Sequence, residues 1–189
     1  MSQPAITQAI AKLEAHFGHA LFQRRNARIF VTMQGDILRS RVERALRHLR
    51  VGIQRATRKR RAGIEGLVTT TQLRALLAVE EMGSFSDAAR SIGIRQPSLH
   101  RSARDLEKIA ALDFFKKTPQ GIELTPAAQE LADHTHLMFH ELSMAYEDLF
   151  DHEGHDGGKI VIGTLPLARS KVLPDAINQI IKQRPNCRA

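Results

Sequence analysis

The chain has 189 residues, of which 42% are hydrophobic, enough to form the cores of one to three compact units. No apolar run is long enough to span a bilayer, and the single cysteine, Cys187, excludes a disulfide framework and a zinc site built from several thiolates. We therefore expect a cytoplasmic protein without membrane contact. The formal net charge is +8, and residues 1–66 carry 14 Lys and Arg against four acidic residues, a balance that attracts polyanions.

The chain begins with a partial copy of a segment that it later contains in full. Residues 2–38 align without a gap with residues 95–131, so that Gln3 falls on Gln96 at an offset of 93. Eight of the aligned pairs are identical, and several others are conservative exchanges. Such self-similarity indicates an internal duplication.

Residues 1–56 comprise the partial first copy and a linker helix. The apolar positions of this helix recur at helical spacing and are Leu38, Val42, Ala45 and Leu49. Residues 57–67 form a basic linker. Because the first copy lacks two helices that precede its counterpart, we expect it to be a poor independent fold and the natural protein to begin upstream of Met1.

The second copy opens with two helices that the first copy lacks. Thr70 or Thr71 is expected to cap the first helix, and Ser84 or Ser86 to begin a short second helix. A glycine closes each of them. The residues of the short helix expected to point inward are Phe85, Ala88, Ala89 and Ile92.

A third helix, starting near Gln96, completes a helix-turn-helix from Phe85 to Arg104. Its outward face and wing are the predicted DNA-binding residues Arg95, Gln96, Pro97, Ser98, His100, Arg101, Arg104, Lys116 and Lys117. The second helix of such a motif lies in the major groove, where Arg pairs with guanine and Gln with adenine. On composition alone, an ordinary solvated helix face is an equal alternative.

A hairpin and a long helix follow the third helix. The stretch "FFKKTPQGIELT" predicts a hairpin or wing, whose lysines are placed to meet phosphates. Residues 126–150 then form a helix with apolar residues stepping four and three, a seam expected to pair two protomers. The predicted dimerisation residues are Leu131, Met138, Leu142, Ala145 and Leu149.

The last part of the chain has the pattern of an incomplete α/β domain. Residues 151–158 are a polar, glycine-rich hinge. Residues 159–189 comprise the apolar strand "KIVIG" and an amphipathic helix, which together predict the first βα unit of such a domain. The fold class expected from these elements is mainly α: winged helix-turn-helix, long helix, and the start of an α/β domain.

Residues 68–150 resemble the N-terminal domain of LysR-type transcriptional regulators. The stretch "GSFSDAARSIGIRQPSLHRSARDLE" follows the family's "SF..AA..L" and "SQPA.S..I..LE" helices, and "LDFFKK" and "IELTPAA" follow its "L..LFER" and "..LT.AG". The remainder is similar to the opening of the family's effector-binding domain. Ala111 and Ala128 stand where the family usually has glycine.

The resemblance implies a sequence-specific regulator that binds double-stranded DNA through a winged helix-turn-helix at residues 68–125. It implies a homodimer or higher oligomer formed through the linker helix and, in a full-length protein only, a small-molecule effector near Thr164. The stretches "SQPAITQAIAKLE" and "LFQRR" resemble the same domain from its recognition helix onward. The DNA-binding residues implied there are Ser2, Gln3, Pro4, Thr7, Gln8, Arg24, Arg25 and Arg28.

Other functions receive less support from the sequence. Histidines cluster at residues 134–140 and 152–155, but their spacing does not fix a third metal ligand, so we expect neither a metal nor another cofactor. The chain has no nucleophile elbow and no phosphate-binding loop, so we do not expect an enzyme. Two alternatives stay open: a truncated interaction module that heterodimerises without specific DNA binding, and a non-specific nucleic-acid binder.

Overall fold

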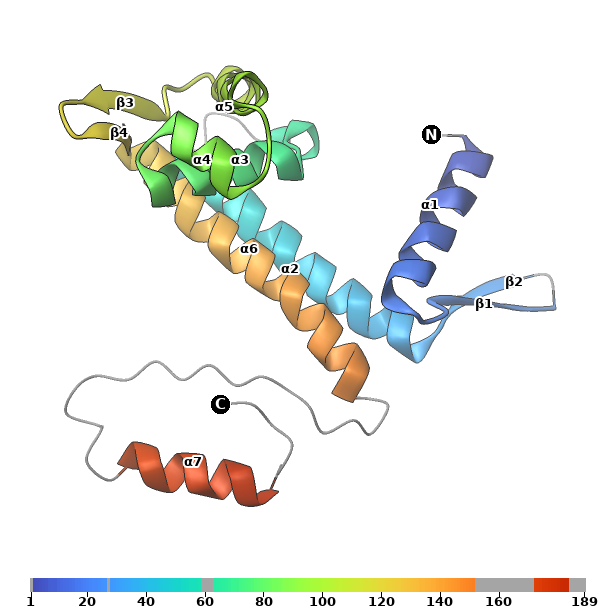
Figure 1. Ribbon diagram of the computed structural model, residues 1–189. Coiled ribbons are helices and arrows are strands. Elements are labelled where there is room, and N and C mark those ends of the chain that lie inside the picture. Colours follow the sequence, from blue (N-terminus) through green and yellow to red (C-terminus); the bar gives the residue numbers. More distant parts are fainter. Residues whose placement is uncertain (1, 27, 59–62, 152–171, 184–189) are drawn as a thin grey trace. The chain divides into compact units, whose positions relative to one another are not determined.

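The computed structural model describes residues 2–26, 28–58, 63–151 and 172–183. The predicted mainly α fold class is confirmed (Figure 1). The chain divides into two compact units: unit 1 comprises Met1–Val42 and Leu142–Ala189, and unit 2 comprises Glu43–Glu141. The hinge at residues 152–158, the strand "KIVIG" and Thr164 lie outside the described residues.

Unit 1 contains the partial first copy. Its helix α1 (Gln3–Phe17) is followed by a hairpin of β1 (Phe22–Arg25) and β2 (Arg28–Val31), and then by the start of α2 (Met33–Ala56). The end of α6 (Pro126–Asp151) also belongs to this unit, as does α7 (Val172–Gln183).

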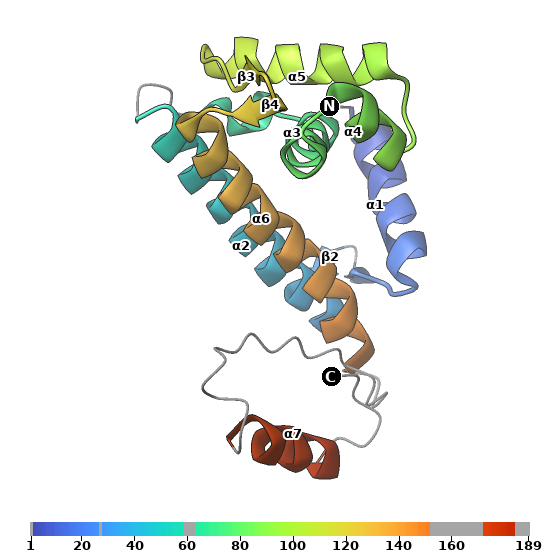
Figure 2. The ribbon, with the colours of Figure 1, turned by 60° about the vertical axis from the view of Figure 1, so that its left-hand side comes forward.

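Unit 2 contains the complete second copy. After the short 3-10 helix η1 (Ile64–Leu67) come α3 (Thr70–Met82), α4 (Phe85–Ser91) and α5 (Gln96–Ala110). The antiparallel hairpin of β3 (Phe115–Thr118) and β4 (Gly121–Leu124) leads into α6. In Figure 2, α5 is seen along its length and α3 end-on beneath it, so the two helices cross.

The start of α3 differs by a residue from the sequence prediction. Thr69, not Thr70 or Thr71, caps the helix: its side chain accepts a hydrogen bond from the backbone N–H of Gln72. The Gln72 side chain in turn accepts a bond from the N–H of Thr69 at 2.8 Å, which completes a capping box. Three consecutive threonines offer equivalent caps, and the returning Gln72 side chain selects among them.

Helix α4 packs as predicted on three of its four inward positions. Ser84 caps it, and Phe85, Ala88 and Ala89 are buried in one cluster with residues of α3 and α5. The prediction for Ile92 was wrong, because this residue follows the end of α4 as its C-cap and is 36% exposed.

Helices α2 and α6 lie side by side in both ribbon views (Figures 1 and 2). Within unit 2 they run antiparallel, since Arg44 pairs with Glu141 and Arg55 with Glu130. Within unit 1, Leu38 and Ala145 share a buried cluster. No helix among the described residues combines the length and apolar character needed to cross a bilayer.

His134 is a half-buried base in this helix pair. Its Nδ1 atom is buried and has no hydrogen-bond partner among the described residues. Burial lowers the pKa of His134 below its ordinary value, with Arg55 and His48 adding to the effect and Glu130 and Asp133 opposing it. The folded chain therefore disfavours the protonated imidazole.

Acidification is expected to destabilise unit 2 through His134. The unfolded chain takes up this proton near pH 6.5, whereas the folded chain resists it, so stability falls as the pH drops below about 6.5. When the pH is lowered from roughly 7.5 to roughly 5.5, the melting temperature measured by circular dichroism should fall less for His134→Asn than for the unsubstituted chain. Equal losses in the two proteins would contradict this assignment.

Ala111 carries backbone strain that its counterpart in the first copy avoids. Both residues end a helix in the left-handed region, Gly18 with φ 73° and Ala111 with φ 52°. Ala111→Gly should raise the free energy of unfolding by roughly 0.5–1 kcal/mol, because the relieved strain exceeds the entropy that glycine adds to the unfolded chain. In thermal melts, Ala111→Gly should raise the melting temperature, whereas Gly18→Ala should lower it. A lower melting temperature for Ala111→Gly would contradict the assignment of backbone strain to Ala111.

Candidate nucleic-acid interface

In the second reading head, defined as α3, α4, α5, β3 and β4, the recognition helix α5 packs against a hydrophobic core formed with α3 and α4. Arg95 precedes the helix and Pro97 occupies its first turn, where the missing N–H of proline costs nothing. The inward side chains Leu99 and Ala103 are fully buried in the cluster formed with α3 and α4. This packing fixes which face of α5 points outward.

The outward face of α5 consists of the side chains predicted from the sequence, with one difference. The exposed predicted residues are Arg95, Gln96, Pro97, Ser98, Arg101 and Arg104. His100 is half-buried and stacks on Phe85, with ring centroids 4.1 Å apart. Because this stacking ties the imidazole to the core, His100 supports the helix as well as bordering its outward face.

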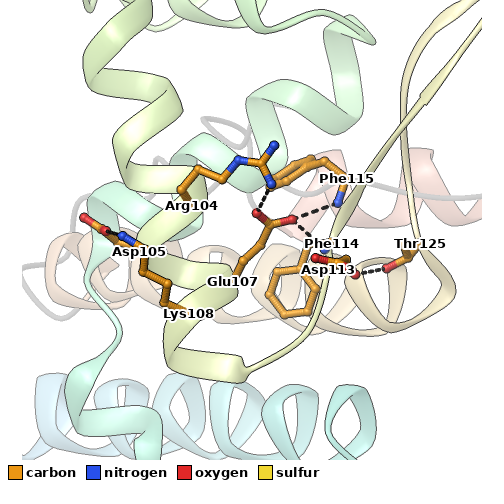
Figure 3. Close-up of polar contacts among 8 residues, drawn as sticks. All are labelled: Arg104, Asp105, Glu107, Lys108, Asp113, Phe114, Phe115 and Thr125. Carbon is orange, nitrogen blue, oxygen red and sulfur yellow. Dashed lines mark hydrogen bonds and ion pairs between the residues drawn. The ribbon is translucent and has the colours of Figure 1, made fainter.

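Arg104 is engaged within the protein. Its Nη1 atom donates to Oε2 of Glu107 at 2.7 Å, so its guanidinium is only partly available for another ligand (Figure 3). Arg95 and Arg101, in contrast, form no ion pair with another described residue. These two arginines therefore carry the uncompensated charge of the helix face.

Glu107 joins the recognition helix to the wing, a role that the sequence prediction missed. Glu107 is 5% exposed, and its Oε1 atom accepts hydrogen bonds from the backbone N–H groups of Phe114 at 2.8 Å and Phe115 at 3.3 Å (Figure 3). Thr125 closes the other side of the hairpin by donating to the carbonyl of Asp113 at 2.9 Å. The wing is thereby fixed relative to α5.

The wing lysines differ from each other in their surroundings. Lys116 pairs across the hairpin with Glu123 at 2.9 Å, and this contact holds the pKa of the Glu123 carboxyl below its ordinary value. Lys117 is exposed and forms no ion pair with another described residue. It lines a shared hollow with Gln96 and His100, so the wing and the start of α5 form one surface.

In the first reading head, defined as α1, β1 and β2, Glu14 makes the same contacts as Glu107 does in the second. We call this arrangement, a helix carboxylate bonded to two backbone N–H groups of the following hairpin, the carboxylate lock. Glu14 Oε1 accepts from the N–H groups of Leu21 at 2.8 Å and Phe22 at 3.1 Å. Thr32 donates to the carbonyl of Ala20 at 2.7 Å. The two locks occupy equivalent positions in the duplication, since Glu14 aligns with Glu107 and Thr32 with Thr125. Their identity in both copies was the signal in the sequence that could have revealed them.

The predicted DNA-binding residues of the first head are exposed, and the helix α1 that carries four of them has no buried side chain. All eight are exposed: Ser2, Gln3, Pro4, Thr7, Gln8, Arg24, Arg25 and Arg28. Helix α1 has no buried residue, and the apolar side chains Ile6 and Leu13 are 46% and 41% exposed. Their counterparts Leu99 and Leu106 are buried in the second head. Among the described residues, no helices equivalent to α3 and α4 are packed against α1.

The side chains predicted to pair protomers are used inside one chain. Leu131, Met138, Ala145 and Leu149 are buried on α6, which lies beside α2, and Leu142 is half-buried. That these side chains also pair two protomers stays a prediction. Among the described residues, no group of three His, Cys, Asp or Glu side chains is placed to hold a metal ion.

Removal of the Glu107 carboxylate should destabilise the second head. Glu107→Ala strands two backbone N–H groups and is expected to lower the free energy of unfolding by about 2–3 kcal/mol in chemical denaturation. Asp105→Ala on the same helix is the matched control, because it breaks only the exposed pair with Lys108 and should cost less than about 0.5 kcal/mol. Equal losses of unfolding free energy in the two variants would contradict a stabilising role for the contacts between Glu107 and the two backbone N–H groups.

Similarity to known proteins agrees with this architecture. A family model described as bacterial regulatory helix-turn-helix protein, lysR family, matches residues 1–36 and 70–129. The HTH-type transcriptional regulator GalR of Pseudomonas putida is 29% identical over 198 residues, covering 99% of this chain and 47% of the relative. The uncharacterized HTH-type transcriptional regulator YdcI of Escherichia coli is 27% identical over 112 residues, covering 59% of this chain and 36% of the relative.

Solved structures give partial matches. The hydrogen peroxide-bound C206S mutant of Corynebacterium glutamicum OxyR has a TM-score of 0.43 at 24% identity, covering 64% of this chain and 39% of that one. Full-length CbnR in complex with its target DNA has a TM-score of 0.41 at 23% identity, covering 62% and 41%. The chain spans less than half the length of the relatives named here. Since the family model matches about half of its residues, across both copies, the chain belongs to the lysR family of bacterial regulatory helix-turn-helix proteins.

Proposed function

We propose that the chain is the DNA-binding part of a transcriptional regulator that reads the major groove with α5. The observation that carries this proposal is the outward face of α5, where Arg95, Gln96 and Arg101 stand exposed on a helix seated by buried contacts. Arginine and glutamine form paired hydrogen bonds with guanine and adenine edges, so this face is suited to direct readout. Family membership supports the same function.

The wing supplies contacts of a different kind. Lys117 lies on the same surface as Gln96 and is available to a phosphate, which would orient the head without selecting a base. Lys116, already paired with Glu123, is the weaker phosphate ligand of the two. The proposal therefore assigns sequence recognition to the helix and positioning to the wing. We propose no catalytic step for the chain, and we propose that it binds DNA in the cytoplasm.

Non-specific binding through the basic first third of the chain is less well supported. Several arginines of α2 are engaged by carboxylates of the same chain: Arg39 by Asp36, Arg41 by Asp148, Arg44 by Glu141, Arg50 by Glu65, and Arg55 by Glu130. Charge compensated in this way attracts a polyanion less than the composition suggests.

A small-molecule effector bound near Thr164 stays a proposal for a full-length protein.

Substitution of helix and wing residues should separate the two roles. A preferred site is first selected from a random DNA library at near-physiological salt. Arg101→Ala should then relax base preference at one position by about 1–3 kcal/mol, whereas Lys117→Ala should weaken all sequences alike and reduce the salt dependence of log K by about one phosphate contact. Fluorescence anisotropy across a salt series measures both effects. Failure to enrich any motif, with both variants losing affinity uniformly, would contradict the proposal.

A further inference from the structure

The two long helices make the same contact twice, with the copies exchanged. In unit 1, Leu38 of α2 shares a buried cluster with Ala145 of α6. In unit 2, Leu131 of α6 lies 3.4 Å from the position that a Cβ would take at Gly52 of α2. The offset of 93 that relates the copies converts Leu38 into Leu131 and Gly52 into Ala145. Reciprocal contacts of this kind are the mark of a two-fold interface between identical subunits, here contained in one chain.

The charges on the two helices favour this pairing over pairing of like helices. Helix α2 carries six arginines and two acidic residues, whereas α6 carries six acidic residues and neither Lys nor Arg. Two α2 helices, or two α6 helices, would place like charges opposite each other, which is unfavourable. The sequences of the two linker helices are therefore complementary to each other.

Ion pairs between the helices make use of this complementarity. Arg41 donates to both oxygens of Asp148, from Nε at 2.5 Å and from Nη2 at 2.9 Å. The two side chains are only 19% and 30% exposed, so solvent screens this pair less than an ordinary surface pair. Arg44 donates to Glu141 at 2.9 Å. Two-point arginine–carboxylate contacts also fix the relative register of the elements that carry them.

We propose that α2 and α6 of one chain take the place of the helix pair that would otherwise join two protomers. One chain then supplies two different reading heads. The heads differ at equivalent positions, since Gln8 in α1 corresponds to Arg101 in α5 and Ser2 corresponds to Arg95. Because glutamine prefers adenine and arginine prefers guanine, the DNA site consists of two unlike halves. This last step rests on the DNA-binding function proposed above.

The first head is anchored well enough to take part. The Glu14 lock holds its hairpin against the end of α1. Phe17 at that same end packs on Tyr146 of α6, with ring centroids 4.6 Å apart. Leu21 is buried in the cluster with Leu38 and Ala145. The anchor of α1 thus comes from the helix of the other copy, so the intrachain helix pair also serves as the support of the first head.

Site-directed crosslinking tests whether the helices pair within one chain. In a Cys187→Ser background, Arg55→Cys and Glu130→Cys replace two exposed side chains that face each other across α2 and α6. With a short bismaleimide crosslinker, the doubly substituted chain should crosslink at the mass of one chain. A mixture of the two singly substituted chains should give no product of double mass. Abundant double-mass product from the mixture would overturn intrachain pairing.

Base selection by matched variants tests whether both heads read DNA. The variants are Gln8→Ala and Arg101→Ala, which truncate equivalent positions of α1 and α5. Each should relax base preference, by roughly 5- to 150-fold at one position, in a different half of the selected site. A site with two identical halves, unaffected by Gln8→Ala, would overturn the inference of two heads. If no motif is selected at all, the proposed DNA-binding function fails, while crosslinking still decides how the helices pair.

Discussion

A glutamate carboxylate on the helix holds each reading head together. Glu107 in the second head and Glu14 in the first accept two backbone N–H groups at the start of the following hairpin. A recognition helix is useful only if the wing beside it keeps a fixed position, and a hairpin of four-residue strands has little core of its own to supply that rigidity. The carboxylate provides it, because a charged acceptor satisfies both amides and releasing them is costly.

The same device works in two very different settings, which separates its role from that of the core. In the second head, α3 and α4 bury Leu99 and Ala103, so the lock is added to a hydrophobic core beneath the helix. In the first head, α1 has no buried residue in the described part of the chain, yet the hairpin is held in the same way. The polar lock therefore fixes the local geometry of helix and wing, while the apolar seat determines which face of the helix is outward.

The duplication has let the copies specialise. The linker helix of the first copy is rich in arginine and that of the second in carboxylates, so the two attract each other where identical helices would repel. The backbone has diverged as well, because Gly18 fills the left-handed helix end that Ala111 fills under strain. These differences arise readily when both partners of an interface lie on one chain, since each side can change independently.

Local signals in the sequence determined most of the second head. Pro97, the cap at Ser84 and the helical spacing of Leu99, Ala103 and Leu106 act within a few residues, so the helix-turn-helix and the outward position of Arg101 could be predicted. Only the tertiary structure decided which surface covers the apolar seam of α6, because periodicity shows that a seam exists without naming its partner. It also decided that His100 stacks on Phe85 and that Lys116 and Arg104 are engaged by carboxylates. Such contacts depend on where side chains from separate elements meet, and a single helix pattern does not contain that information.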